Sequence, residues 1–153
     1  MMRAIRVLLA GLAITLAAPC LAGDSDIEYY SANPDMQLPF SDAVRVGNML
    51  YLSGKIGNIP GTPQLADGGI AGETRQALEN IKASLEKQGS SMSEVVKCTV
   101  FLADIGEWAA MNEVYVTYFS VNPPARSALG TSGLALNARV EIECFAAMQG
   151  TGH

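Results

Sequence analysis

Histidine is almost absent from this sequence, and its scarcity excludes several kinds of catalytic site. The only histidine among the 153 residues is His153, the last one. Catalysis by a Ser-His-Asp or Cys-His arrangement needs an imidazole within the fold, so we exclude both. Because the chain has only 3 cysteines besides, we also expect no zinc or other metal site.

Positive charge is the second scarcity. The chain has 10 Lys and Arg residues against 15 Asp and Glu residues, and the basic residues form no cluster. A protein that binds nucleic acid normally carries a basic patch that contacts the phosphate backbone. We therefore expect no nucleic-acid partner.

A long apolar run occurs only near the N-terminus. Residues 1–22 combine a basic start, an apolar run over 7–18 that is too short to cross a bilayer, and small residues ahead of a cleavage point after Ala22. These features predict a secretory signal peptide. A lipidated Cys20 or a retained anchor is the less favoured alternative, because Pro19 fits a lipidation site poorly.

Removal of the signal leaves residues 23–153 as one domain, in a chain that is 49% hydrophobic and can bury a core. This domain has 8 basic and 15 acidic residues, a formal charge of −7. We expect it to be periplasmic or secreted, with no membrane association after cleavage.

Cys98 and Cys144 remain in the processed chain, each within an apolar, β-branched stretch. Export makes a disulfide possible, but a buried free thiol also behaves as a small apolar side chain. Because the sequence does not show whether the two strands are neighbours, we expect free thiols and keep the disulfide as the alternative.

The pattern of apolar residues predicts the first half of the domain. Residues 23–37 have no period and predict a loosely held arm. Two apolar runs, 41–46 and 49–54, flank Gly47-Asn48 and predict a β-hairpin. Residues 57–72, rich in glycine and proline, predict a loop.

Helical spacing then predicts a helix over 73–88, ended by Gly89. A strand is expected over 95–102, with alternate residues on its inner side: Val96, Cys98, Val100 and Leu102. Asp104 and Glu107 resemble a capping box that opens a second helix running to about residue 119. The inner stripe expected for that helix consists of Trp108, Met111, Tyr115 and Tyr118.

This order of elements predicts an α/β fold in which two helices cover one face of a single mixed sheet. The opposite face would carry Thr99, Phe101, Glu141, Glu143 and Phe145. Because this mixture is too apolar for a solvated face and too charged for a core, we expect a subunit interface there.

Arg126 and Glu141 stand out in a chain with few charges. In the last strand, Glu141 and Glu143 alternate with apolar residues and so share one side. Glutamates that only solvate this side are one interpretation. An ion pair between Arg126 and one of the glutamates across the strands is another.

The segment Pro124-Ala125-Arg126-Ser127-x-Leu129, with Val140-Glu141-Ile142 downstream, resembles the signature of the reactive intermediate deaminase family. This is the RidA or YjgF group, also labelled L-PSP endoribonucleases. The resemblance covers nearly all of residues 23–153. It extends through these further segments: Val46-Gly47-Asn48, Leu52-Ser53-Gly54, the helix from Thr74 to Leu85, Val96 to Leu102, and Asn112-x-x-Tyr115.

The resemblance implies a chorismate-mutase-like fold that assembles as a homotrimer with clefts between subunits. It implies hydrolysis of enamines and imines, such as 2-aminoacrylate and 2-iminopropanoate, to 2-oxo acids and ammonia, with no cofactor. Arg126 matches the family residue that binds the substrate carboxylate, a task that suits the planar guanidinium fork. Glu141 matches the residue that positions or activates the attacking water.

Five further residues match the same cleft in the family: Ser53, Gly54, Asn112, Phe40 and Ala128. Phe40 stands where many members have a tyrosine, and Ala128 where some have a cysteine. The connection over residues 120–124 is also shorter than is usual in this family. An exported member implies a substrate other than cytosolic 2-aminoacrylate, for example an imine released by amino-acid oxidation.

Two other functions remain open. A non-catalytic or chaperone-like trimer of the same family would use Arg126 to hold small carboxylates without turnover. The ribonuclease label is disfavoured by the charge of −7 and by the absence of histidine elsewhere in the chain.

Overall fold

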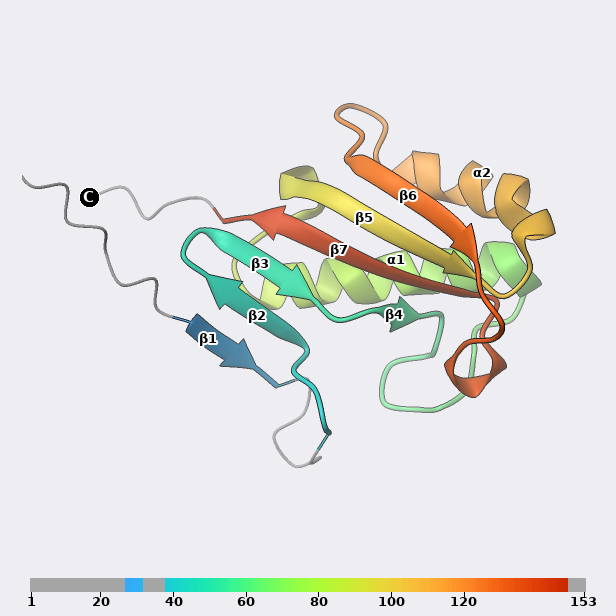
Figure 1. Cartoon of the computed structure of the whole chain (residues 1–153), viewed down its shortest axis with the longest axis horizontal. Coiled ribbons are helices and arrows are strands. Elements are labelled where there is room, and N and C mark those ends of the chain that lie inside the picture. Colours follow the sequence, from blue (N-terminus) through green and yellow to red (C-terminus); the bar gives the residue numbers. More distant parts are fainter. Residues whose placement is uncertain (1–26, 32–37, 149–153) are drawn as a thin grey trace, which may run out of the picture.

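The fold is one mixed sheet, seen face-on in a computed structural model that describes residues 27–31 and 38–148 (Figure 1). The strand order is β1-β2-β3-β7-β5-β6, and the short β4 lies beside β7. The expected signal peptide, residues 1–22, and His153 lie outside the described residues. The strands are β1 Ile27–Tyr30, β2 Ala43–Val46, β3 Met49–Leu52, β4 Lys55–Ile56, β5 Val95–Leu102, β6 Ala125–Gly130 and β7 Val140–Ala147.

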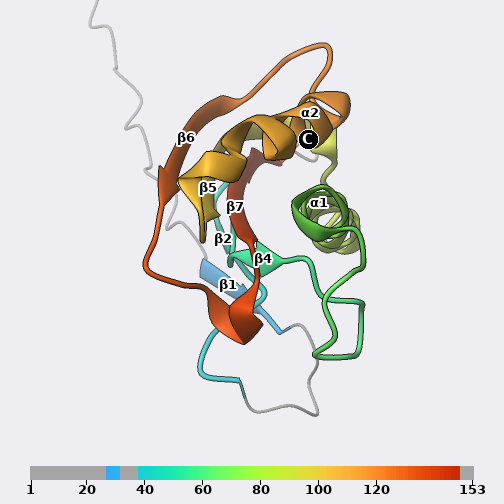
Figure 2. The ribbon, with the colours of Figure 1, turned by 90° about the vertical axis from the view of Figure 1, so that its right-hand side faces the viewer.

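Both helices lie on the same side of the sheet (Figure 2), which confirms the predicted architecture. They are α1, Gly69–Lys87, and α2, Trp108–Tyr118. Only β5 and β6 pair in parallel; the other paired strands are antiparallel. A parallel pair needs a crossover, and α2 supplies it, so this helix is carried next to the edge strand β6.

The core fills the space between the helices and the sheet. Most of its residues come from α1, β5 and β7. The fully buried apolar side chains of these three elements include Leu78, Ile81, Leu85, Cys98, Val100, Leu102, Val140, Ile142 and Cys144. The expectation that Val96 faces inward is wrong, because it is 45% exposed. A register shift between Val95 and Lys97 reverses the alternation there and buries Val95 instead.

α1 begins earlier than the sequence predicts. Residues 57–72 were expected to be a loop, yet the helix starts at Gly69. Gly72 makes this possible, because a β-carbon there would lie 1.9 Å from the carbonyl oxygen of Asp67. The predicted end is confirmed: Gly89 has φ +75°, and the N–H groups of Gly89 and Ser90 bond back to the last helical turn as in a Schellman motif.

The expectation of a loosely held arm over 23–37 is wrong for residues 27–30. This segment is β1, which pairs antiparallel with β2 from Ile27 opposite Val46 to Tyr30 opposite Ala43. Tyr29 is 70% exposed on this edge strand. None of the residues of β1 is buried, because an edge strand with an open face needs few buried residues, so the segment lacks the apolar run that predicts a strand.

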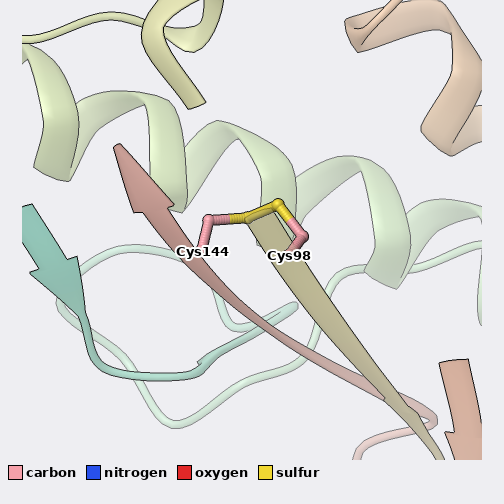
Figure 3. Close-up of a disulfide and its surroundings, with 2 residues drawn as sticks. All are labelled: Cys98 and Cys144. Atoms are coloured by element: carbon pink, nitrogen blue, oxygen red, sulfur yellow. A yellow bond between two sulfur atoms is a disulfide. The ribbon is translucent and has the colours of Figure 1, made fainter. Parts of the chain in front are cut away.

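The expectation of free thiols is also wrong, because Cys98 and Cys144 form a disulfide (Figure 3). The two residues lie directly opposite each other on β5 and β7, with their Cα atoms 4.1 Å apart. Both are fully buried, on the sheet face covered by α1. Only the register of β5 against β7 brings them together, which is why the sequence did not reveal the pair.

The second helix departs from its prediction in two ways. Asp104 accepts a hydrogen bond from the N–H of Gly106, but Glu107 bonds to Arg139 instead of completing a capping box. Met111 and Tyr115 are buried as expected. Trp108 is 40% exposed and lies beside Arg126 instead of in the core. Within the described part of the chain, no helix is long and apolar enough to cross a membrane.

Candidate active site

Arg126 lies on the edge strand β6 with its side chain against α2. Its Nη1 atom donates a hydrogen bond of 2.8 Å to Oδ1 of Asn112. The guanidinium carbon is 4.5 Å from the ring centroid of Tyr115 and 5.5 Å from that of Trp108, distances at which cation–π attraction is favourable. We call these residues, Trp108, Asn112, Tyr115 and Arg126, the arginine half-site.

Helical periodicity explains how the arginine half-site forms. Trp108, Asn112 and Tyr115 occupy one face of α2, because residues four and three positions apart follow the 3.6-residue turn. Burial raises the pKa of Tyr115 to about 12, against the opposing effect of the Arg126 charge. Tyr115 therefore stays neutral and offers the guanidinium a ring without competing charge.

Arg126 has capacity to bind a ligand. Among the described residues, Asn112 is its only hydrogen-bond acceptor and no carboxylate lies within ion-pair distance of it. The interpretation of Arg126 as an ion-pair partner of Glu141 or Glu143 is therefore wrong. Its remaining N–H groups form a planar fork suited to a carboxylate.

Glu141 lies on the other face of the sheet, beside Gly54. Val140 and Ile142, its neighbours in β7, are buried beneath the helices, so Glu141 points to the open face. A β-carbon added at Gly54 would lie 2.0 Å from Oε1 of Glu141. Only a glycine at this position leaves the carboxylate room.

The environment of Glu141 makes its carboxylate more basic. Burial raises its pKa, and the negative charge of Glu143 on the same face raises it further. The described residues give Glu141 neither a hydrogen-bond donor nor a cation. A partly buried carboxylate without a partner and with a raised pKa is typical of a group used in proton transfer.

Ser53 and Phe40 belong to two segments of the chain that a side-chain hydrogen bond joins next to Gly54. Ser53 precedes Gly54, and its hydroxyl donates a 2.6 Å hydrogen bond to the carbonyl of Ser41. That bond holds the segment containing Phe40, whose side chain is 60% exposed. We call Ser53, Gly54 and Glu141 the glutamate half-site; Phe40 is linked to it through its neighbour Ser41, which Ser53 contacts.

The two half-sites do not meet within one chain. Arg126 is paired with Cys98, which faces the helices together with Cys144, whereas Glu141 faces away from them. Ala128, paired with Val100, also lies on the helix-covered side and packs against the core. The structure thus groups Arg126 with Asn112 and Glu141 with Gly54, but not Arg126 with Glu141.

Sequence reasoning assigned Trp108 and Tyr115 to the core and so missed their contact with Arg126. A signal was present, because Asn112 occupies the same helical face and was identified as a site residue. The ion pair between Lys55 and the buried Asp42, close to Ser53 and Gly54, was also missed. Among the described residues, no cluster of three or more His, Cys, Asp or Glu side chains could hold a metal ion.

The open face of the sheet surrounds the glutamate half-site. It carries exposed apolar side chains on the two edge strands, β1 and β6, and on the inner strand β3, and these are Ile27, Tyr29, Leu129 and Tyr51. The rings of Tyr51 and Phe145 pack against each other in a tilted arrangement, with centroids 5.0 Å apart. A sheet face this apolar is typical of a surface that another protein chain covers.

This combination of fold and half-sites agrees with comparisons to known proteins. Residues 30–148 match the sequence profile of the family described as Endoribonuclease L-PSP, so the chain belongs to this family, the RidA group. It is 45% identical over 108 residues to the human 2-iminobutanoate/2-iminopropanoate deaminase, covering 71% of this chain and 79% of that one. The rat deaminase of the same name is 45% identical over 107 residues, covering 70% and 78%.

Solved structures show the same fold. RidA from an Antarctic Psychrobacter superposes with a TM-score of 0.70 at 38% identity, covering 78% of this chain and 94% of that chain. A protein of the Rid family from Yersinia pestis gives a TM-score of 0.74 at 34% identity, covering 80% and 100%. The chorismate-mutase-like architecture expected from the sequence is therefore that of its structural relatives.

Proposed function

We propose that this protein hydrolyses reactive 2-imino acids to 2-oxo acids and ammonia, at sites that each combine two chains. The observation that carries this proposal is the separation of Arg126 and Glu141 on opposite faces of one sheet. Among the described residues, Arg126 keeps N–H groups without an acceptor, and Glu141 has neither a donor nor a cation. The arginine half-site has no proton acceptor for water, and the glutamate half-site has no cation for a carboxylate. A complete site forms if the arginine half-site of one chain meets the glutamate half-site of its neighbour.

The arginine half-site binds and orients the substrate. The free N–H groups of Arg126 pair with the substrate carboxylate, while Asn112 and the two aromatic rings hold the guanidinium in place. A fixed guanidinium loses less conformational entropy on binding than a mobile one. The imine carbon is thereby held at a defined position opposite the neighbouring chain.

The glutamate half-site supplies the proton transfers. A protonated imine is already electrophilic, so water attacks its carbon while Glu141 accepts a proton from that water. The resulting carbinolamine then receives that proton from Glu141 on nitrogen, the carbon–nitrogen bond breaks, and ammonia leaves while the hydroxyl proton passes back to Glu141 as the carbonyl forms. General-base help of this kind typically contributes about 10²- to 10⁴-fold, and placement of the two reactants supplies much of the remainder.

A homotrimer provides this arrangement. One half-site contacting a different half-site is a heterologous contact, and such contacts close into a ring when the rotation between copies permits. The apolar open face supplies the surface for the contact. Support for a threefold ring comes from the family resemblance carried by Pro124 to Leu129 and Val140 to Ile142.

Export of the protein forms part of the same proposal. A disulfide persists mainly in oxidising compartments such as the periplasm, and Cys98 and Cys144 form one in the described chain. This supports a periplasmic or secreted location, in agreement with the signal expected over residues 1–22. An imine produced by extracytoplasmic amino-acid oxidation is the corresponding substrate.

The test generates imino acids in situ with an amino-acid oxidase and follows their decay and the release of ammonia. We expect wild type to accelerate decay, Arg126→Ala to lose the acceleration mainly through KM, and Glu141→Gln mainly through kcat. If all three proteins behave alike, or none differs from buffer, the proposal is wrong. Saturable binding of a 2-oxo acid without turnover would instead favour the non-catalytic carboxylate-binding trimer.

A further inference from the structure

A cavity of about 220 Å³ lies between α2 and the start of β6, beside Arg126. Its walls come from the second half of α2, the connection that follows it and the first residues of β6, and they are Asn112, Tyr115, Val116, Phe119, Pro123, Pro124 and Arg126. The chemistry proposed above uses Arg126, Asn112 and Tyr115, but it assigns no role to the apolar part of the cavity formed by Val116, Phe119, Pro123 and Pro124.

The walls have a clear chemical character. Arg126 is the only charged residue among them, and Asn112 supplies one amide, whose oxygen is already bonded to Arg126. Val116, Phe119, Pro123 and Pro124 are apolar. Such a space fits a molecule with a carboxylate at one end, paired with the guanidinium, and an apolar group at the other.

The volume limits the size of that group. A water-sized group occupies about 30 Å³ of liquid volume, so a cavity of 220 Å³ holds roughly seven such groups. A carboxylate accounts for three atoms and the imine carbon that joins it to the side chain for a fourth, which leaves room for about three side-chain carbons. Pockets for drug-sized ligands are larger, about 300–1,000 Å³, so a small metabolite fits best.

We infer that this cavity receives the substrate side chain, and that the protein prefers 2-imino acids with a branched aliphatic side chain over those of the aminoacrylate type. The inference rests on the proposed function, because a carboxylate bound to Arg126 is what brings the side chain to the cavity. Val116 is the specificity-determining residue, since it lines the cavity from α2 and its side chain is 48% exposed.

The short connection after α2 contributes to this preference. Phe119, Pro123 and Pro124 line the cavity, and Pro123 and Pro124 have restricted backbone angles. A wall built from adjacent prolines holds its shape when the cavity is empty. The ligand therefore meets a preformed space and pays little for ordering it.

Binding of stable product analogues tests the inference directly. Trp108 is the only tryptophan in the chain and lies 5.5 Å from the Arg126 guanidinium, so its fluorescence reports occupancy of the arginine half-site. We compare 2-oxobutanoate with 4-methyl-2-oxopentanoate, which has two more carbons. Each newly buried methylene strengthens binding about fourfold, so we expect the longer acid to have a Kd roughly 15-fold lower.

Two variants isolate the cavity. Val116→Phe fills it and should bring the ratio of the two Kd values close to unity, whereas Val116→Ala enlarges it and should preserve the preference for the longer acid. Val121→Phe is the matched control, because Val121 is 84% exposed on the same connection and does not line the cavity. The control should keep the wild-type ratio.

The inference is overturned if wild type binds both acids equally, or if Val116→Phe and Val121→Phe give the same ratio. Turnover of imino acids made from alanine and from leucine is measured on the same proteins. Selective binding without turnover would reject the proposed function and keep the cavity assignment. Turnover that does not depend on side-chain size, in both wild type and Val116→Phe, would keep the proposed function and reject the cavity assignment.

Discussion

Gly54 lies directly against the carboxylate of Glu141, so closely that a β-carbon on Gly54 would come within 2.0 Å of Oε1. The two residues belong to neighbouring segments of the sheet, where β4 continues past Gly54 along β7. The carboxylate therefore occupies space that any other residue at position 54 would take. The position of the Glu141 carboxylate therefore depends on the absence of a side chain at residue 54.

Gly54→Ala should consequently lower kcat/KM for imine hydrolysis by about 10²-fold, the typical effect of moving a catalytic group by about 1 Å. Since the carboxylate is the end of a flexible side chain, we expect it to swing aside and Tm to change little. Gly106→Ala is the control, because its added β-carbon would lie 3.1 Å from Asp104 on the helix side. Full activity of Gly54→Ala would argue against a positioned Glu141.

Mixing two inactive variants tests whether the site spans two chains. Arg126→Ala keeps the glutamate half-site, and Glu141→Gln keeps the arginine half-site. Co-refolding them in equal amounts should restore about a quarter of wild-type activity, since random mixing in a ring pairs two intact half-sites in that fraction of interfaces. Each variant refolded alone is the control. No recovery would indicate that both residues act within one chain.

The pH profile should report Glu141. Burial and the charge of Glu143 raise the pKa of Glu141, and the water-activating form is the carboxylate. kcat/KM should therefore fall as the pH drops through this raised pKa. Glu143→Gln removes the repulsion and should shift the acid limb to lower pH, whereas Glu86→Gln, an exposed residue of α1, should leave it in place. An unchanged limb in Glu143→Gln would contradict the assignment.

The raised pKa of Glu141 also predicts that its ionisation destabilises the fold, whereas a carboxylate in a salt bridge would stabilise it. Because Glu141 ionises less readily in the folded chain than in the unfolded chain, its ionisation lowers stability above the folded pKa. This penalty disappears as the pH falls below the unfolded value. Glu141→Gln should thus raise Tm near neutral pH and not in acid, measured at one protein concentration. A lower Tm at neutral pH would show that Glu141 stabilises the fold.

Removing the disulfide should reduce stability without removing activity. It closes a loop with a sequence separation of 46 residues, for which the chain-entropy relation gives about 4 kcal/mol. Cys98→Ala/Cys144→Ala should unfold at lower denaturant concentration, and the sulfurs lie on the helix-covered face, away from Glu141. The double variant in reducing buffer serves as the control and should show no further loss. Equal stability of wild type and variant would refute this role.

Local patterns were sufficient for much of the fold. The turn at Gly47, the end of α1 at Gly89 and the alternation around Glu141 each depend on residues close in sequence, and each prediction is confirmed. Errors arose where a distant segment decides the outcome. The strand at 27–30 forms because β2 offers it an edge, and Val96 turns outward because β7 sets a register shift in β5.

The sequence by itself determined the family, the two helices on one face of a mixed sheet, and the identity of Arg126 and Glu141 as the unusual charges. These follow from short-range periodicity and from a specific local motif. Only the tertiary structure decided that Arg126 points toward the helices while Glu141 points away. The face of each side chain depends on how β6 and β7 are registered on β5, and that register is set by packing between segments far apart in the chain.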